Sequence, residues 1–128
     1  MDIGKLKNNK VYRELDFCDD EIILMLKENP EFNLYIWEGY FDDIFGEPPL
    51  NGLGWRGFTR DVCEFAGAFS RKNGEGTELS DLEEYLSDLL EYEDKSFRFP
   101  ETREVFNLVA DFLRYAIETN QTVFMQVV

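Results

Sequence analysis

Residues 100–128 read PETREVFNLVADFLRYAIETNQTVFMQVV, a helical pattern that is followed directly by a strand pattern. Pro100 suits the first turn of a helix, where its missing N–H group would have no partner. Asn120 marks the end of this helix, and residues 122–128 are predicted to form a terminal strand. Spacings of three and four residues give the helix one wide apolar face, formed by Val105, Leu108, Val109, Phe112, Leu113, Ala116 and Ile117.

A second amphipathic helix is predicted over residues 80–93. Ser80 and Glu83 match the capping box, in which the Ser side chain bonds forward and the Glu side chain reaches back. The predicted buried stripe consists of Leu82, Tyr85, Leu86, Leu89 and Leu90. The opposite stripe is acidic and consists of Asp81, Glu84, Asp88 and Glu91.

Residues 32–37 are predicted to form a strand with both faces covered. Aromatic and β-branched residues are frequent there, and Phe32, Leu34 and Ile36 alternate with more polar neighbours. A helix over residues 31–45 is the competing interpretation, because Phe32, Tyr35, Ile36, Gly39 and Tyr40 also follow helical spacing.

Other segments complete the expected fold. A short helix is predicted over 20–29, because acids precede it and Pro30 follows it. A short strand is expected over 11–17, a loop over 46–57, and a helix from Thr59 to about Lys72. Together these elements predict a helix-rich α+β fold in one domain, residues 1–128, with about four helices packed with a small sheet. That sheet contains 32–37 and the C-terminal strand.

Composition supports a folded and strongly acidic domain. Of the 128 residues, 44% are hydrophobic, including 12 Phe, 6 Tyr and 2 Trp, so a sizeable core can form. The net charge of −14 argues against direct binding to nucleic acid or to an anionic membrane. Histidine is absent, which removes the side chain that most often titrates near neutral pH.

The sequence also predicts a cytoplasmic location. Residues 1–7 lack the apolar core of a signal peptide, and no apolar run approaches the roughly 20 residues that span a bilayer. The only cysteines are Cys18 and Cys63, a number typical of a reducing compartment, although a disulfide between them stays open.

Negative charge is concentrated in two stretches. Residues 73–94 contain nine acids and no Lys or Arg, and residues 28–55 contain six acids among several aromatics. A solvated helix face is the alternative explanation, but like charges at i and i+4 cost stability. Acids interleaved with aromatics are typical of a surface that recognises Lys and Arg. The predicted partner-binding residues are Trp37, Glu38, Tyr40, Asp42, Asp43, Glu84, Asp88 and Glu91, with Trp55 as a further anchor or a core residue.

No catalytic constellation is recognisable, so the protein is predicted not to be an enzyme and to need no cofactor or metal. Residues 52–57 spell G-x-G-x-x-G, but a prolyl stretch precedes them where a nucleotide fold needs a buried strand. Asp42 and Asp43 lie near Glu38 and Glu47 without the spacing of a calcium loop. Without histidine there is no Ser-His or Cys-His dyad.

A small acidic domain with an aromatic and acidic surface resembles the bacterial toxin-immunity proteins. The resemblance is one of size, acidity and surface type. It implies a protein that covers the basic active-site region of a cognate toxin, often a nuclease, and neutralises it. The alternatives are a DNA mimic that occupies a nucleic-acid-binding protein, and a small enzyme that uses carboxylates alone.

Overall fold

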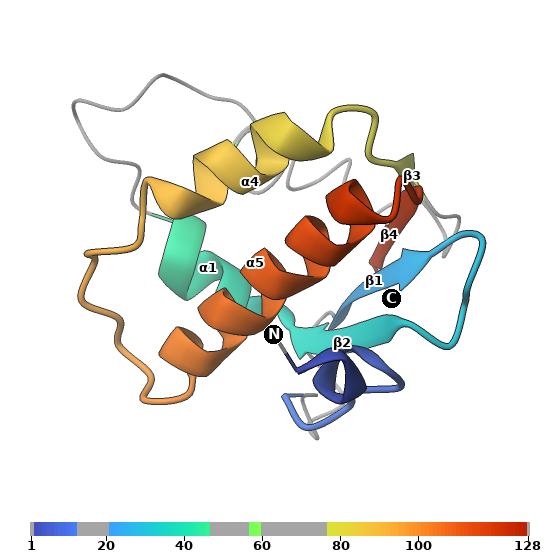
Figure 1. Ribbon diagram of the computed structural model, residues 1–128. Coiled ribbons are helices and arrows are strands. Elements are labelled where there is room, and N and C mark those ends of the chain that lie inside the picture. The colour runs from blue at the N-terminus through green and yellow to red at the C-terminus, as the bar shows by residue number, and fades with distance from the viewer. Residues whose placement is uncertain (1, 13–20, 47–56, 60–76, 128) are drawn as a thin grey trace.

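The sheet and helices pack as an α+β domain, as predicted (Figure 1). The structure is a computed structural model, and it describes residues 2–12, 21–46, 57–59 and 77–127. Helix α5 (Thr102–Glu118) runs through the middle of the molecule, with α4 (Leu82–Leu90) along one side and α1 (Glu38–Phe45) behind it. The sheet lies on the other side of α5.

The sheet is antiparallel and four-stranded in the described part of the chain, with the order β2-β1-β4-β3. Strand β1 (Glu21–Leu26) is central and pairs with β2 (Asn33–Trp37) and β4 (Val123–Val127). The short β3 (Thr77–Glu78) pairs with β4. Leu24 is opposite Leu34 on one side and Met125 on the other, so the apolar core continues across three strands.

The predicted helix over 20–29 is wrong, because residues 21–26 form the central strand. The six residues EIILML form one short apolar run, which fits a buried strand better than a helix. Isolated helices of this length are marginal in water, whereas β1 gains backbone hydrogen bonds from neighbours on both edges. Pro30 lies in the turn that connects β1 to β2.

Both interpretations of residues 31–45 are partly correct. The strand prediction for 32–37 is confirmed by β2, and the helical spacing continues into α1, which begins at Glu38. Trp37 occupies the N-cap position in an extended conformation, where the strand changes into the helix. The chain thus turns at Trp37 and carries its aromatic residues to one end of the sheet.

The N-terminal segment covers the outer edge of β2. A 3-10 turn, η1 (Ile3–Leu6), is followed by residues 7–12, which pair irregularly with the strand. Asn9 donates to the Asn33 carbonyl at 3.0 Å and accepts from the Tyr35 amide at 2.8 Å. Within the predicted strand over 11–17, residues 11 and 12 form a turn, and the remainder lies outside the described residues. This segment covers edge groups that are otherwise a template for aggregation.

Helix α5 agrees closely with its sequence pattern. Its buried face includes all predicted apolar positions except Ile117, which is half-buried. Asn120 has a φ of 54°, in the left-handed region that commonly follows a helix end. The predicted terminal strand is confirmed as β4. Because η1, α1 and α4 also pack on α5, this helix is the centre of the core.

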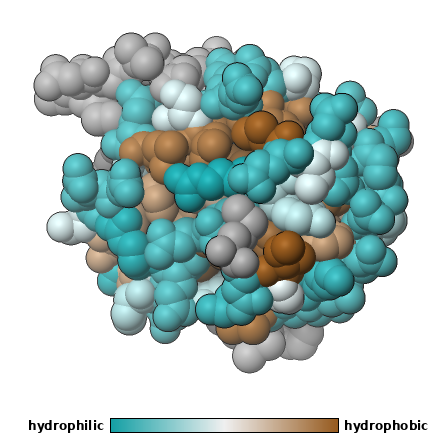
Figure 2. Space-filling view, viewed as in Figure 1, coloured by the Kyte–Doolittle hydropathy of each residue, from teal (hydrophilic) through white to brown (hydrophobic). Residues whose placement is uncertain are grey.

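Helix α4 is confirmed, but its cap is shifted by one residue. The helix begins at Leu82. The side chain that caps it is Asp81, not Ser80, and its carboxylate accepts a hydrogen bond from the Glu84 amide at 3.1 Å. It ends at Leu90, and residues 91–94 continue as turns. The leucines of α4 lie against α5, and a brown band in Figure 2 follows this side of α4. The predicted capping box at Ser80 is therefore wrong.

The expected exposure of Asp88 on α4 is also wrong, since this side chain is only 1% exposed. Its carboxylate accepts from the Thr59 amide at 2.8 Å and from the Thr59 hydroxyl at 2.8 and 2.9 Å. The Thr59 hydroxyl also lies 2.6 Å from the Tyr92 hydroxyl. Gly57, at a φ of 55°, leaves room for α4, because a Cβ there would lie 3.0 Å from the Cβ of Asp88. Asp88 thus anchors α2 (Gly57–Thr59) to α4.

Several predictions lie outside the described residues. These concern the helix from 60 to 72, most of the loop over 46–57, Trp55, and both cysteines. Within the described residues, no helix has the length and apolarity that crossing a bilayer requires.

Replacing Asp88 with Ala should destabilise the protein by roughly 2–5 kcal/mol, because the buried Thr59 amide loses its acceptor and the Thr59 hydroxyl keeps only the Tyr92 hydroxyl as a partner. Urea unfolding followed by circular dichroism measures the loss. The control, Glu83→Ala, removes an exposed acid of the same helix and should change stability by no more than about 0.5 kcal/mol. Equal effects of the two variants would contradict the anchoring role of Asp88.

Candidate partner-binding surface

Four half-buried aromatic residues from separate segments meet beside the start of α1. Trp37 lies edge-on to Tyr40 and to Phe99, with ring centroids 5.2 and 5.3 Å apart. Tyr40 also contacts Phe99 at 6.0 Å and Tyr12 at 6.2 Å. We call these four residues the aromatic cluster. Two of the predicted anchors, Trp37 and Tyr40, are therefore brought together, whereas Tyr12 and Phe99 were missed.

Gly39 allows the Trp37 ring to lie over the first turn of α1. A Cβ at position 39 would stand 2.4 Å from two ring atoms of Trp37, closer than any real contact. The indole therefore packs directly on the helix backbone at Gly39. The sequence signal for this packing is the short spacing Trp-Glu-Gly-Tyr at 37–40.

Exposed carboxylates border the aromatic cluster. Glu38 and Asp42 lie on α1 and are exposed, as is Glu104 on α5. The Tyr12 hydroxyl donates to the Glu104 carboxylate. Burial, together with this hydrogen bond and the nearby negative charge, raises the pKa of Tyr12 to about 12. Tyr12 therefore stays protonated at neutral pH and keeps Glu104 in a fixed orientation beside the cluster.

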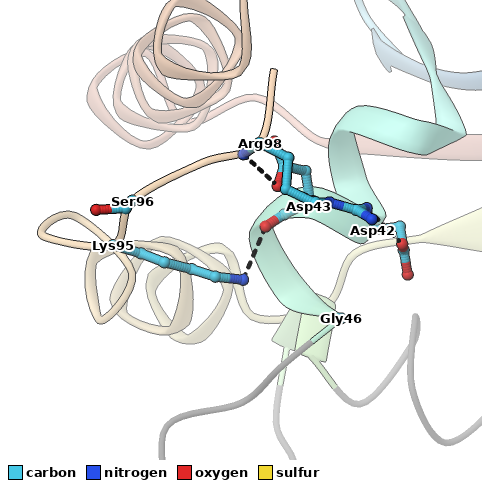
Figure 3. A pocket seen from close by; sticks show the side chains of 6 residues that line it. All are labelled: Asp42, Asp43, Gly46, Lys95, Ser96 and Arg98. Atoms are coloured by element: carbon cyan, nitrogen blue, oxygen red, sulfur yellow. Dashed lines mark hydrogen bonds and ion pairs between the residues drawn. The ribbon is translucent and has the colours of Figure 1, made fainter. Parts of the chain in front are cut away.

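Asp43 was predicted to face a partner, but it is buried, with an exposed fraction of 3%. Its carboxylate accepts from the Arg98 amide at 2.9 Å (Figure 3). It also accepts from the Phe99 amide at 3.1 Å and from the Thr102 hydroxyl at 2.6 Å. Burial alone would raise the pKa of Asp43, but these hydrogen bonds outweigh it and lower that pKa. The predicted location of Asp43 on the binding surface is therefore wrong, because this side chain joins α1 to the start of α5.

The loop at 95–98 also binds α1 through a side chain of its own. Lys95 donates from Nζ to the carbonyls of Asp43 and Ile44 at 2.7 and 3.1 Å, near the negative end of the α1 dipole (Figure 3). Arg98 pairs with Asp42 at 3.2 Å. A polar hollow of about 150 Å³ lies between these groups. Both of its cations are already bound by oxygens of the chain, so the hollow does not offer a ready anion site.

The remaining predicted residues lie on α4 and in the turn that follows it, and none of them belongs to the aromatic cluster. Glu91 is exposed and Glu84 is half-buried, whereas Asp88 is buried as described above. Exposed acids also occupy positions 83, 93 and 94, and their side chains make no ion pair within the described part of the chain. The structure therefore gives two acidic regions, one around the aromatic cluster and one on α4, in place of one continuous face.

The chemistry of these regions fits binding. A general acid near neutral pH needs a carboxyl group with a raised pKa, whereas the pKa of Asp43 is lowered. Among the described residues, no three acidic or cysteine side chains are arranged to hold a metal ion. Aromatic rings bordered by carboxylates instead offer apolar area and favourable contacts for Arg and Lys side chains.

Comparisons with protein-family models, with curated proteins and with solved structures find no match.

Replacing Asp43 with Asn should weaken the dependence of stability on pH. The folded state holds the pKa of Asp43 below its unfolded value of about 3.9. Its stabilising contribution is therefore complete above that value and is lost as pH falls through the folded pKa. We expect the variant to be less stable at pH 7 and to lose less further stability on acidification to about pH 3.

Unfolding free energies from urea titrations at several pH values test this expectation. Asp42→Asn is the matched control, because Asp42 is an exposed neighbour whose ion pair with Arg98 is worth little. Parallel pH profiles for the wild type and Asp43→Asn would contradict the role given to Asp43.

Proposed function

We propose that the protein binds a basic protein partner and neutralises it, in the manner of a toxin-immunity protein. The observation that carries this proposal is the aromatic cluster, four half-buried rings bordered by exposed carboxylates. Interface energy concentrates in a few aromatic side chains that are surrounded by polar groups. The rings contact one another, and a hydrogen bond from its amide to Asp43 holds the backbone of Phe99, so less order has to be gained on binding.

The charge of the protein supports a basic partner. The chain carries a net charge of −14, and the exposed side chains of Glu83, Glu93 and Asp94 make no ion pair within the described part of the chain. Such acids repel one another in the free protein. A basic partner removes this repulsion, and its attraction over distance accelerates the encounter.

The partner class that best fits is a toxin domain with a basic active-site cleft, such as a nuclease. A nuclease must attract a polyanion, so its active site is complementary to an acidic protein. Neutralisation needs only that the cleft be covered, and it requires no catalytic group on this chain. A DNA mimic needs carboxylates along a length comparable to a turn of duplex, about 34 Å. Helix α4, with nine residues, extends over only about 13 Å.

Salt should control the rate of association with the partner. The protein encoded beside this one is the first partner to purify, and a one-to-one complex that suppresses its activity is expected. Because exposed charges are screened over about 10 Å at 0.1 M salt, the on-rate should fall steeply between low and physiological salt. Stopped-flow or surface-based kinetics measures it. Inhibition that needs a large molar excess would indicate nonspecific competition by a polyanion and would contradict the proposal.

Replacing Tyr40 with Ala should weaken the complex by about 2 kcal/mol or more, since Tyr40 contacts the three other rings of the cluster. The matched control is Tyr115→Ala, which removes an equally half-buried tyrosine that stacks on Phe32 at 4.9 Å, away from the cluster. Calorimetric titration gives the affinities, and thermal unfolding shows whether each variant folds. Equal affinity losses in two folded variants would place the anchors elsewhere.

A further inference from the structure

A second surface feature adjoins the aromatic cluster. A hollow of about 470 Å³ lies between the N-terminal segment and α5. Tyr12 belongs to both features, because it lines this hollow and its ring lies 6.2 Å from that of Tyr40. Glu104, the acceptor of the Tyr12 hydroxyl, also lines the hollow. A molecule that covers the aromatic cluster therefore reaches the hollow across Tyr12.

Apolar side chains form part of the lining of the hollow. Leu6 and Leu108 line it and are 1% and 7% exposed, whereas Val11 at its rim is 77% exposed. Val11 and the nearby Ile3, at 43%, are the large apolar side chains that stay exposed in the described part of the chain. Figure 2 shows separate brown patches in the region where Figure 1 places the N-terminal segment, set among teal residues. Val11 thus offers exposed apolar surface at the rim of a hollow that a side chain of another molecule could enter.

The polar part of the rim is predominantly acidic. Asp2, Glu104 and Asp111 contribute carboxylates, and Lys5 is the one basic residue among the residues that line the hollow. Asp111 keeps 37% of its side chain exposed although Arg114 lies 3.6 Å away. The rim therefore favours a cation over an anion, and the walls favour an apolar group.

We infer that this hollow receives a segment of the basic partner in which an apolar side chain stands next to a Lys or Arg. This inference rests on the proposed function and names the part of the partner that the surface recognises. The apolar side chain packs against Val11 and Leu108. The neighbouring cation lies beside Glu104 and Asp111, with the Glu104 carboxylate oriented by the Tyr12 hydroxyl.

A small probe tests the hollow without any partner. Isopentylguanidinium joins a branched apolar group to a planar cation and so carries both features that the hollow should recognise. Titrated into the isotopically labelled full chain, it should shift amide NMR signals of residues 2–12 and 104–111. Isopentyl sulfate, with the same apolar group and the opposite charge, should produce weaker shifts there. Equal shifts from both probes, or shifts spread over the whole surface, would overturn the inference.

Variants then test the hollow in the complex. Val11→Arg places a cation at the rim and should weaken partner binding at least about tenfold, with folding preserved because the side chain is exposed. Lys5→Gln removes the rim cation and should strengthen binding about threefold. The matched control is Lys10→Gln, since Lys10 lies over the Tyr35 ring at 4.8 Å and does not line the hollow. Its effect should be smaller than that of Lys5→Gln.

The outcomes separate this inference from the proposed function. If Val11→Arg and Lys5→Gln bind the partner like the wild type while Tyr40→Ala does not, the inferred role of the hollow is overturned and the proposed function stands. If the wild type binds no basic partner, the proposed function fails and the inferred occupant of the hollow fails with it, even where the guanidinium probe binds there. If the free protein dimerises and Val11→Arg makes it monomeric in sedimentation experiments, a second copy occupies the hollow and the inference is overturned.

Discussion

The buried carboxylate of Asp43 is the interaction on which the arrangement of this protein depends. It lies on α1 and accepts hydrogen bonds from two loop amides and from the first residue of α5. Lys95, in the same loop, donates hydrogen bonds to two carbonyls near the end of α1. Trp37 and Tyr40 are at the other end of the same helix, and Phe99 is in the loop. The hydrogen bonds between α1 and the loop therefore bring these three rings together. Losing a buried acceptor of this kind leaves several donors unpaired at once.

Acidic composition alone overstates the charged surface of this chain. Asp43 and Asp88 look like any other acid in the sequence, yet both are buried and fully engaged in holding segments together. Each accepts from backbone amides and from a threonine hydroxyl, an arrangement that compensates a carboxylate for its lost hydration. The exposed acids of α4 and of the start of α1 are a separate population. An acid must be exposed, as these are, to face a partner.

Sequence patterns predicted the helices and strands whose conformation is determined by their own residues. The helix from Thr102 and the strand at Asn33–Trp37 have clear periodicity, and both are confirmed. Strand β1 was mistaken for a helix because its conformation is set by pairing with β2 and β4, which lie on both of its edges. Tyr12 and Phe99 were missed because they join Trp37 only through tertiary packing. The burial of Asp88 depends in the same way on Thr59, 29 positions away in the chain.

In the proposed complex, the two acidic regions have different physical roles. The acids of α4 act over distance through the field they create, so they influence how fast the partner arrives and are sensitive to salt. The aromatic cluster acts only in contact, and its rings are positioned by packing on one another and by the hydrogen bonds of the Phe99 amide and the Tyr12 hydroxyl. Fixed rings lose little entropy on binding, so they mainly slow dissociation. An antidote requires both properties, because it must capture its target quickly and then remain bound.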